Sequence, residues 1–435
     1  MIPIDGPVRP GDLLIRQGRI AALLSPGSPA AEVPVLDASG CLVLPGLVQA
    51  HVHLCQTLFR GRADDLPLLR WLRERVWPYE AALDETSLRA AARLGAAELL
   101  LSGTTTILDM GTVHGQDALA DAIAQTGLRA TLGKAMMDRG EGVPRRLRET
   151  TRESLAESDA LCRRWHGAAE GRIRYAYAPR FILSCSDALL RGVAERVADG
   201  DDRGPRAHTH AAEQRDEVAL VRARMGTDNI HGLRRLGIAG PRTVLAHCVH
   251  TDARQRRTLA RDGTHVVHCP SSNLKLGSGV APIAELLALG ASVALGADGA
   301  PCNNNLDGFL ELRLAALLQK ARRGAATLPA ARALELATLG GARALGLEQE
   351  IGTLAVGKLA DVIVVEPRVL HATPQADPVE MLVYALRGSD VRDVLVDGRL
   401  LVRGRTLTPL TGLDVEALRA EAEQQAQRVR QRAGL

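Results

Sequence analysis

Short apolar runs and longer helical runs alternate through the middle of the chain, from about residue 45 to about residue 350. The apolar runs are only a few residues long and indicate buried strands. The runs between them are rich in Ala, Leu and Arg, as at 86–102, 152–166 and 308–320, and indicate helices. The predicted strands are, in order, LVQAHVHL, TTTILDM, RATLGKAMMD, RIRYAYAP, RAHTHAA, TVLAHCVH, HVVHCP and SVALGADG.

Eight strand–helix units in a stretch of about 250–300 residues predict an α/β fold of the TIM-barrel type, a (β/α)8 barrel. We expect it to occupy residues 45–351. A doubly wound open sheet is the alternative, and the count of eight favours the barrel.

Strand-like runs separated by turn residues also occur near both ends of the chain, at residues 11–24, 33–44, 361–367 and 393–405. Because both ends are β-rich and the middle is not, we expect one small β-sandwich domain made from residues 1–44 and 352–410. Residues 411–435 are predicted to form a charged C-terminal helix.

The composition and charge of the chain indicate which kinds of molecule it binds. Hydrophobic residues make up 46% and charged residues 24%, as in an ordinary soluble globular protein. The 54 basic and 50 acidic residues nearly balance, which argues against a dedicated binder of nucleic acid or membrane surfaces. Aromatic residues are scarce, which disfavours stacking on single-stranded nucleic acid. The expected partner is a small molecule.

The seven cysteines are scattered without a C-x-x-C pair, which is typical of reduced thiols in the cytoplasm. The first residues lack the basic and apolar segments of a signal peptide. The longest apolar stretch, 286–297, is too short to span a bilayer. We therefore expect a soluble cytoplasmic protein.

Histidines and one aspartate stand at the ends of several predicted strands. His51 and His53 end the first barrel strand, where residues two apart point the same way. His210 ends the fifth strand, His247 the sixth and Asp298 the eighth. Active sites of such barrels lie at the carboxyl ends of the strands, so we expect these side chains to converge.

Three neutral nitrogens and a carboxylate oxygen suit one Zn²⁺, with Fe²⁺ as the alternative, and leave one position open for water. Such an ion lowers the pKa of that water from about 15.7 toward about 7. Asp298 is placed to be both ligand and base. Glu213, three residues after His210, is expected to move protons without binding the ion, although a helix N-terminal acid is the plainer interpretation. His247 is expected to hydrogen-bond the attacked centre or the water.

Several motifs together resemble the amidohydrolase superfamily over nearly the whole chain: LPGLVQAHVHL, HTHAAE, AHCVH, HCPSSNLKLGSG, LGADGAPCNNN and IGTLAVGKLADVIVV. The pattern is most similar to the single-metal aminohydrolases, which include adenosine-type, guanine-type and s-triazine deaminases or chlorohydrolases. The resemblance implies catalytic roles for Glu213 and His247, and a homo-oligomer such as a dimer or tetramer. The metal ligands that it implies are His51, His53, His210 and Asp298.

Two other metal chemistries are disfavoured. Two-metal members of the superfamily use a carbamylated lysine near the end of the fourth strand, where this chain has Arg180. Lys134 lies on the third strand and the chain has few other lysines, so we do not expect a bridging carbamate. The H-x-E…P-C-x-x-C pattern of other zinc deaminases is absent, because asparagines follow Cys302.

The segment 59–80 holds four of the ten aromatic residues, namely Phe59, Trp71, Trp77 and Tyr79. A flat apolar wall beside a metal suits a flat heterocycle, and packing of a lid helix is the alternative. The pattern DDLPL-x-x-WL…WP-x-E resembles deaminases of methylthioadenosine, S-adenosylhomocysteine and 5′-deoxyadenosine. That resemblance implies that Glu80 binds ribose hydroxyls and that Trp71 covers the nucleoside.

Arg180-Phe181 departs from the methylthioadenosine and adenosylhomocysteine pattern, which often has a histidine after the fourth strand. It is more similar to guanine and 5′-deoxyadenosine deaminases. Arg180 is expected to contact purine or ribose acceptors or, alternatively, to be solvated. Cys302 either lines the base pocket or is a buried structural thiol.

These features predict a metal-dependent hydrolytic deaminase of an adenosine derivative, of the 5′-deoxyadenosine, methylthioadenosine or adenosine type, which releases ammonia and a hypoxanthine product. The alternative substrate class is guanine, 8-oxoguanine or an s-triazine, with amine or chloride as the leaving group. The alternative of another kind is a non-catalytic scaffold on the same fold.

Overall fold

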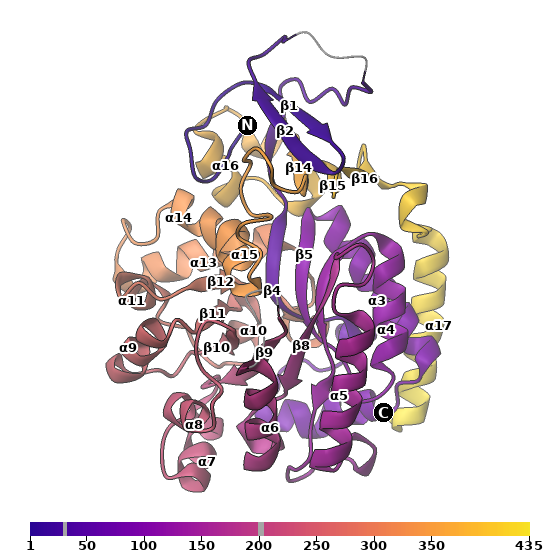
Figure 1. Ribbon diagram of the computed structural model, residues 1–435, viewed down its shortest axis with the longest axis vertical. Coiled ribbons are helices and arrows are strands. Elements are labelled where there is room, and N and C mark those ends of the chain that lie inside the picture. Colours follow the sequence, from indigo (N-terminus) through magenta and orange to yellow (C-terminus); the bar gives the residue numbers. More distant parts are fainter. Residues whose placement is uncertain (29–32, 199–203) are drawn as a thin grey trace.

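The computed structural model describes residues 1–28, 33–198 and 204–435. Its centre is a curved sheet of parallel strands whose neighbours follow chain order (Figure 1). Nearly every residue of these strands is buried. The strands are β4 (Leu47–His53), β5 (Thr104–Met110), β6 (Arg129–Gly133) with the short β7 (Ala135–Met136), β8 (Ile173–Pro179), β9 (Arg206–Ala211), β10 (Thr243–His247), β11 (His265–His268), β12 (Val293–Leu295) and β13 (Asp298–Gly299).

The sheet closes through its eighth strand, which is split into β12 and β13. β12 pairs in parallel with β11, and β13 pairs in parallel with β4. Gly296 lies between the two pieces, where a Cβ would stand only 2.6 Å from the backbone oxygen of His51. The predicted (β/α)8 barrel is confirmed, because the last strand is a neighbour of the first, as an open sheet does not allow.

Helices cover the outside of the barrel (Figure 1). Capping boxes begin three of them: Asp84, Thr150 and Asp252 each accept the N–H of the residue three positions on, whose side chain bonds back. The helices predicted at 86–102, 152–166 and 308–320 correspond to α3, α5 and α13. The longer helices are α3 (Glu85–Leu101), α4 (Gln116–Thr126), α5 (Thr151–Trp165), α6 (Asp187–Ala198), α7 (Arg215–Met225), α9 (Ala253–Asp262) and α13 (Gly308–Arg323). The shorter ones are α8 (Asn229–Arg235), α10 (Pro270–Lys275), α11 (Ile283–Ala288), α12 (Ala300–Asn303), α14 (Ala330–Glu335), α15 (Gly341–Leu345) and α16 (Pro378–Tyr384).

Both ends of the chain build an antiparallel sheet at one end of the barrel (Figure 1). Its order is β17 (Thr406–Leu407), β16 (Arg399–Arg403), β15 (Val391–Val396), β14 (Val362–Val365) and β3 (Leu42–Pro45). The hairpin of β1 (Asp12–Arg16) and β2 (Arg19–Leu24) shares a small apolar cluster with this sheet, through Ile20 and Val362.

One predicted strand segment pairs only in part. Residues 33–44 were predicted as short strands with a turn at Gly40, and the turn is present, with φ +74°. Only residues from Leu42 onward pair, in β3. The residues before the turn contain Pro34, which has no N–H to donate to a ladder.

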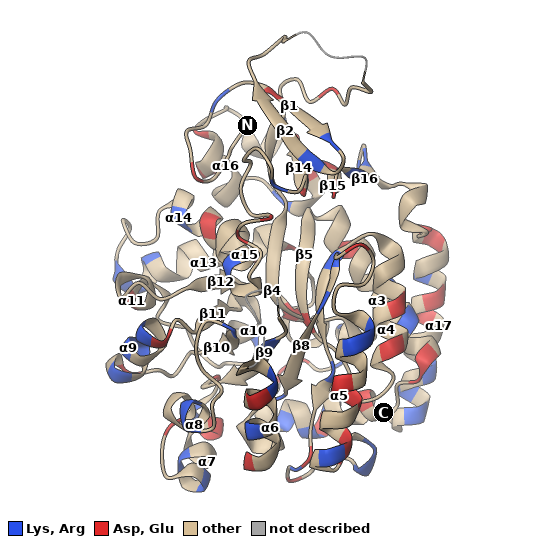
Figure 2. Cartoon of the chain, viewed as in Figure 1, with Lys and Arg blue, Asp and Glu red and all other residues tan. Residues whose placement is uncertain are grey.

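The predicted C-terminal helix is α17 (Val415–Ala433), which runs alongside α3 on the outside of the barrel (Figure 1). Acidic and basic residues are interspersed along α17 and along other outer helices such as α5 (Figure 2). Among the described residues, no helix is both long and apolar enough to cross a membrane.

Candidate active site

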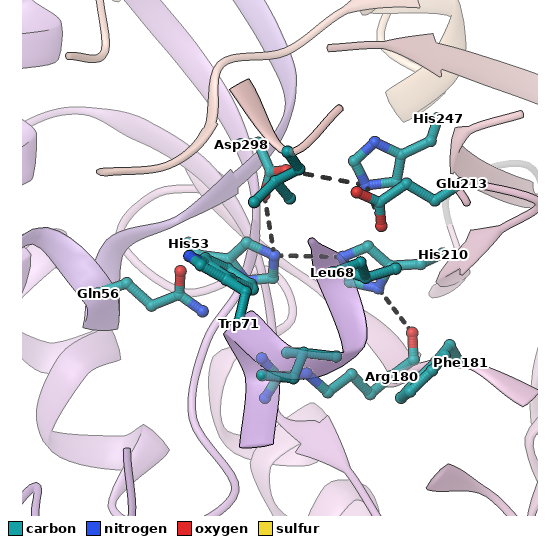
Figure 3. A pocket seen from close by; sticks show the side chains of 12 residues that line it. His53, Gln56, Leu68, Trp71, Arg180, Phe181, His210, Glu213, His247 and Asp298 are labelled. Carbon is teal, nitrogen blue, oxygen red and sulfur yellow. Dashed lines mark hydrogen bonds and ion pairs between the residues drawn. The ribbon is translucent and has the colours of Figure 1, made fainter. Parts of the chain in front are cut away.

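The four predicted metal ligands meet at the carboxyl ends of the barrel strands. His51 and His53 come from β4, His210 from β9 and Asp298 from β13 (Figure 3 labels the last three). One donor atom from each lies within 4.8 Å of the others. Oδ1 of Asp298 is 3.3 Å from Nε2 of His51 and 3.3 Å from Nε2 of His53.

Backbone carbonyls fix the ring protons of two of these histidines. Nδ1 of His53 is 2.7 Å from the oxygen of Met110, and Nδ1 of His210 is 2.6 Å from the oxygen of Arg180. A carbonyl oxygen only accepts, so each Nδ1 carries the proton and each Nε2 is left with a bare lone pair. Burial, followed by the neighbouring His51, lowers the pKa of His53 to about 3, which favours the neutral ring.

The lone pairs of the histidine Nε2 atoms and the Asp298 carboxylate all attract positive charge, so a cation fits between them. The two Nε2 lone pairs of His53 and His210 face each other at 3.2 Å, beside the Asp298 carboxylate. Within the described chain, Nε2 of His51 is also buried without a hydrogen-bond partner. Three nitrogens and one carboxylate oxygen form a donor set suited to a divalent transition metal. The residues present therefore fit a single-metal centre.

The Asp298 carboxylate is held on both sides. The Ser272 hydroxyl donates to Oδ2 at 2.6 Å, and the Gly299 backbone N–H donates to Oδ1 at 2.8 Å. Burial acts to raise the pKa of Asp298, but the neighbouring His51, followed by His247, lowers it well below its usual value. The group is therefore ionised.

Glu213 and His247 lie next to the four-residue group (Figure 3). Nε2 of His247 is 3.6 Å from Oε2 of Glu213 and 3.8 Å from Oδ2 of Asp298. Nδ1 of His247 donates to Oδ1 of Asn273 at 2.8 Å, which fixes the ring. Burial opposes protonation of His247, but the charges of Glu213 and Asp298 outweigh it and raise its pKa.

Glu213 is a carboxyl group that can hold a proton near neutral pH. Burial, and next the charge of Asp298, raise its pKa to about 7. Its backbone N–H donates to the buried Glu217 carboxylate at 3.0 Å, which holds the loop after β9 in place. His247, with φ +74°, and Asp298 are both non-glycine residues in left-handed conformations, which cluster at functional sites.

A cavity lies between these catalytic and metal-binding candidates and a helical segment that covers the carboxyl end of the barrel. α1 (Leu68–Trp71), a π-helical turn (72–76) and α2 (Trp77–Ala81) run continuously, after a 3-10 helix at 54–59. A π-turn within a helix is frequent at functional sites. The lining residues are His53, Gln56, Leu68, Trp71, Leu72, Arg180, Phe181, His210, Glu213, His247, Leu276 and Asp298.

The expected aromatic wall is smaller than predicted. Trp71 lines the cavity, but Phe59 and Tyr79 stack on each other in the barrel core with ring centroids 4.9 Å apart. Trp77 belongs to the same apolar cluster as Trp71 but does not line the described cavity. The second aromatic ring of the wall is Phe181, which follows β8.

Glu80 does not reach the cavity as expected. Its Oε2 accepts from Arg180 at 2.5 Å, and its Oε1 accepts from Gln56 at 2.8 Å and from Arg180 at 3.1 Å. Both charged side chains are about 95% buried or more, so the two charges neutralise each other. Of the three residues, Arg180 and Gln56 line the cavity and Glu80 lies behind them.

Cys302 is also absent from the described cavity lining. Its fully buried thiol donates to the backbone oxygen of Gly299 at 3.1 Å, which favours a structural thiol over a lining of the base pocket. All seven cysteines are free, as expected.

Four residues near the site were missed in the sequence. Gln56 lines the cavity, His208 contacts His51, and Ser272 and Asn273 hold Asp298 and His247. The i, i+2 rule that marked His51 and His53 also marks His208 and His210, and it was a usable signal for His208. Ser272 and Asn273 are ordinary helix-start residues whose role depends on a distant strand end.

Lys134 is engaged away from the four-residue group. Its buried ammonium donates to Glu149 at 2.6 Å and to the backbone oxygen of Val113 at 2.6 Å. It also pairs with Glu157 at 3.3 Å; Glu149 and Glu157, with His114, form a second group of closely spaced side chains. The ammonium places one positive charge between these two carboxyl groups, which disfavours a second cation there.

The chain belongs to the amidohydrolase family, whose model matches residues 42–401. The 5-methylthioadenosine/S-adenosylhomocysteine deaminase of Moorella thermoacetica is 42% identical and covers 97% of this chain and 96% of its own length. The 5′-deoxyadenosine deaminase of Methanothermobacter thermautotrophicus is 42% identical and covers 93% of this chain and 92% of its own. An adenosine deaminase from Xanthomonas campestris, solved with bound zinc, is 33% identical with a TM-score of 0.90, covering 99% of this chain and 96% of its own.

Proposed function

We propose that this protein is a zinc-dependent hydrolytic deaminase of an adenosine derivative, of the 5′-deoxyadenosine, methylthioadenosine or adenosine type. Fe²⁺ is the alternative ion. The observation that carries the proposal is the placement of two carboxyl groups, Glu213 and Asp298, in one cavity beside the histidines of the metal group, with their pKa values shifted in opposite directions. The pKa of Glu213 is raised to about 7 while that of Asp298 is lowered well below its usual value. Such pairs divide the roles of acid and base.

The ion would be held by His51, His53, His210 and Asp298. When bound, it supplies Lewis-acid activation of a water molecule. The two deaminase relatives at 42% identity support the choice of an adenine ring as substrate.

The protein's own residues account for the proton movements. Glu213 gives its proton to N1 of the adenine ring, which makes C6 electrophilic, and the water oxygen forms a bond to C6. One proton of that water restores Glu213. Asp298 accepts the other and passes it to the amino group, so the bond from C6 to the amino nitrogen breaks and ammonia leaves. His247, fixed by Asn273, donates a hydrogen bond to the new oxygen.

Trp71 and Phe181 offer apolar faces that suit a flat purine. Arg180 keeps N–H groups beyond those bonded to Glu80, and these are donors for acceptor atoms of the base or sugar.

A second substrate class, guanine, 8-oxoguanine or an s-triazine, is favoured by one observation. Both oxygens of Glu80 are engaged by Arg180 and Gln56, so the carboxylate expected to bind ribose is not free in the cavity. A free base needs no such group.

Ammonia release from a substrate panel separates the two classes. The zinc-loaded protein is incubated with 5′-deoxyadenosine, methylthioadenosine, adenosine, guanine, 8-oxoguanine and an amino-s-triazine, with the Asp298→Asn variant as the blank. We expect turnover of at least one adenosine derivative, with the hypoxanthine product confirmed by ultraviolet absorbance. Turnover of guanine or the triazine alone would replace the substrate and keep the mechanism. No turnover of any compound by the metal-loaded protein would favour a non-catalytic scaffold.

A further inference from the structure

The three histidines of the candidate metal centre are anchored in two different ways. His53 and His210 each place Nδ1 against a backbone carbonyl oxygen, which no side-chain substitution removes. His51 instead places Nδ1 2.8 Å from Nε2 of the His208 imidazole. Among the ligands, only His51 therefore depends on another side chain for its ring proton.

His208 is a built part of the barrel interior. It lies on β9 two residues before His210, so both side chains leave the strand on the same side. The residue is fully buried, and its ring meets that of His51 edge-on, with centroids 4.9 Å apart. Its Nδ1 is buried and has no hydrogen-bond partner within the described part of the chain. The hydrogen bond between Nε2 of His208 and Nδ1 of His51 is therefore the polar interaction that accounts for a histidine, rather than an apolar residue, at position 208.

The contact allows two arrangements of protons. If Nδ1 of His51 donates to Nε2 of His208, then Nε2 of His51 is a free lone pair and can bind a metal. If His208 donates instead, the proton of His51 moves to Nε2, which faces the Asp298 carboxylate at 3.3 Å and cannot bind a metal. Which tautomer His208 adopts thus decides whether His51 is a ligand or a hydrogen-bond donor.

We propose that His208 is a positioning residue that holds His51 in its metal-binding tautomer by accepting the Nδ1–H hydrogen bond. The inference rests on the metal centre of the proposed function, but it does not depend on the identity of the substrate. Partners of this kind are worth about 10- to 100-fold in metal affinity.

The test is the zinc affinity of metal-depleted protein, measured by competition with a chromophoric chelator. In His208→Leu the acceptor is removed, and we expect affinity to fall by about 10- to 100-fold. In His208→Gln a side-chain oxygen replaces the acceptor nitrogen, and we expect affinity within a few-fold of the unmodified protein. His268→Leu is the matched control, because His268 is fully buried on β11 and neither of its ring nitrogens has a partner among the described residues. We expect its affinity to be unchanged.

Circular dichroism and thermal melting establish that each variant is folded. A second measurement covers the case in which His208→Leu does not fold. In ¹⁵N-histidine-labelled, zinc-loaded protein, the ring signal that disappears in His208→Gln should show a proton on Nδ1 and a bare Nε2.

The outcomes are distinct. Unchanged affinity in folded His208→Leu, equal losses in the Leu and Gln variants, or a proton on Nε2 of His208 would each overturn the inference while leaving the metal centre intact. Absence of zinc binding by the unmodified protein would overturn the metal centre as well.

Discussion

At the scale of single residues, the site depends on where protons lie. Carbonyl oxygens hold the protons of His53 and His210 on Nδ1, and burial raises the pKa of Glu213 to about 7. Asp298 stays ionised beside them. One cavity therefore holds lone pairs for a cation, a proton donor and a proton acceptor.

Glu213 gives the sharpest prediction of pH dependence. Its acid form is the one that donates, and its raised pKa is about 7, so kcat/KM should be level at lower pH and fall as pH rises above about 7. In Glu213→Gln, kcat should fall by roughly 10²- to 10⁴-fold, and the alkaline decline should disappear. Steady-state ammonia release between pH 5.5 and 9 measures both. Glu285→Gln, at a partly buried ion pair with Arg322 outside the cavity lining, is the control. A rate in Glu213→Gln within a few-fold of normal would contradict the assigned role.

The buried Glu80–Arg180 pair gives a prediction on stability. Glu80→Gln leaves the Arg180 guanidinium buried without its counter-charge, which should lower the free energy of unfolding by about 3–5 kcal/mol. Adding Arg180→Gln should cost much less than the sum of the single changes, because the unpaired charge is gone. Urea denaturation measures the cycle, and strictly additive losses would show that the pair is not coupled.

At the scale of elements, the strand and helix pattern was predictable because buried parallel strands are continuous apolar runs. The eight predicted barrel strands correspond to β4 through β13. Two of the predicted strands are interrupted: the third is split into β6 and β7 at residue 134, and the eighth is split into β12 and β13 at Gly296. The segment 54–81 was harder to predict. Its aromatic residues share one sequence neighbourhood but face different neighbours, and the Glu80–Arg180 contact joins residues 100 positions apart.

Two tryptophans of this segment form a matched pair for testing what the covering helix does. Trp71 lines the cavity and Trp77 does not, although both are buried in the same apolar cluster. Trp71→Leu removes an aromatic face worth about 0.5–1.5 kcal/mol, so kcat/KM should fall by roughly 2- to 10-fold. Trp77→Leu should lower the melting temperature and leave kcat/KM near normal. Equal kinetic effects in the two variants would mean that Trp71 does not contact the substrate.

At the scale of the whole molecule, buried ion pairs join the barrel to the terminal sheet. Arg129 on β6 donates to Asp361 at 2.8 and 3.0 Å, immediately before β14, and also pairs with Asp397. These aspartates belong to the far end of the chain, so sequence patterns gave no sign of the contact. The division of the chain into a terminal β domain (1–44 and 352–410), a barrel (45–351) and a C-terminal helix (411–435) stays a prediction. The homo-oligomer and the cytoplasmic location also stay predictions, and sedimentation analysis tests the homo-oligomer.

Arg129→Met should destabilise the molecule strongly. It leaves the buried Asp361 without a counter-charge, and we expect the free energy of unfolding to fall by about 3–5 kcal/mol. Arg70→Met, at an exposed pair on the covering helix, should change it by less than about 1 kcal/mol. A loss of similar size in both variants, read from calorimetry, would contradict a joining role for Arg129.

The most direct test of the account is to locate the metal in zinc-loaded crystals by anomalous diffraction at the zinc edge. We predict one strong peak per chain, bonded to His51, His53, His210 and Asp298, with none at the His114, Glu149 and Glu157 group, whose glutamates already pair with Lys134. An empty four-residue site in protein saturated with zinc, or a peak at the second group instead, would contradict it.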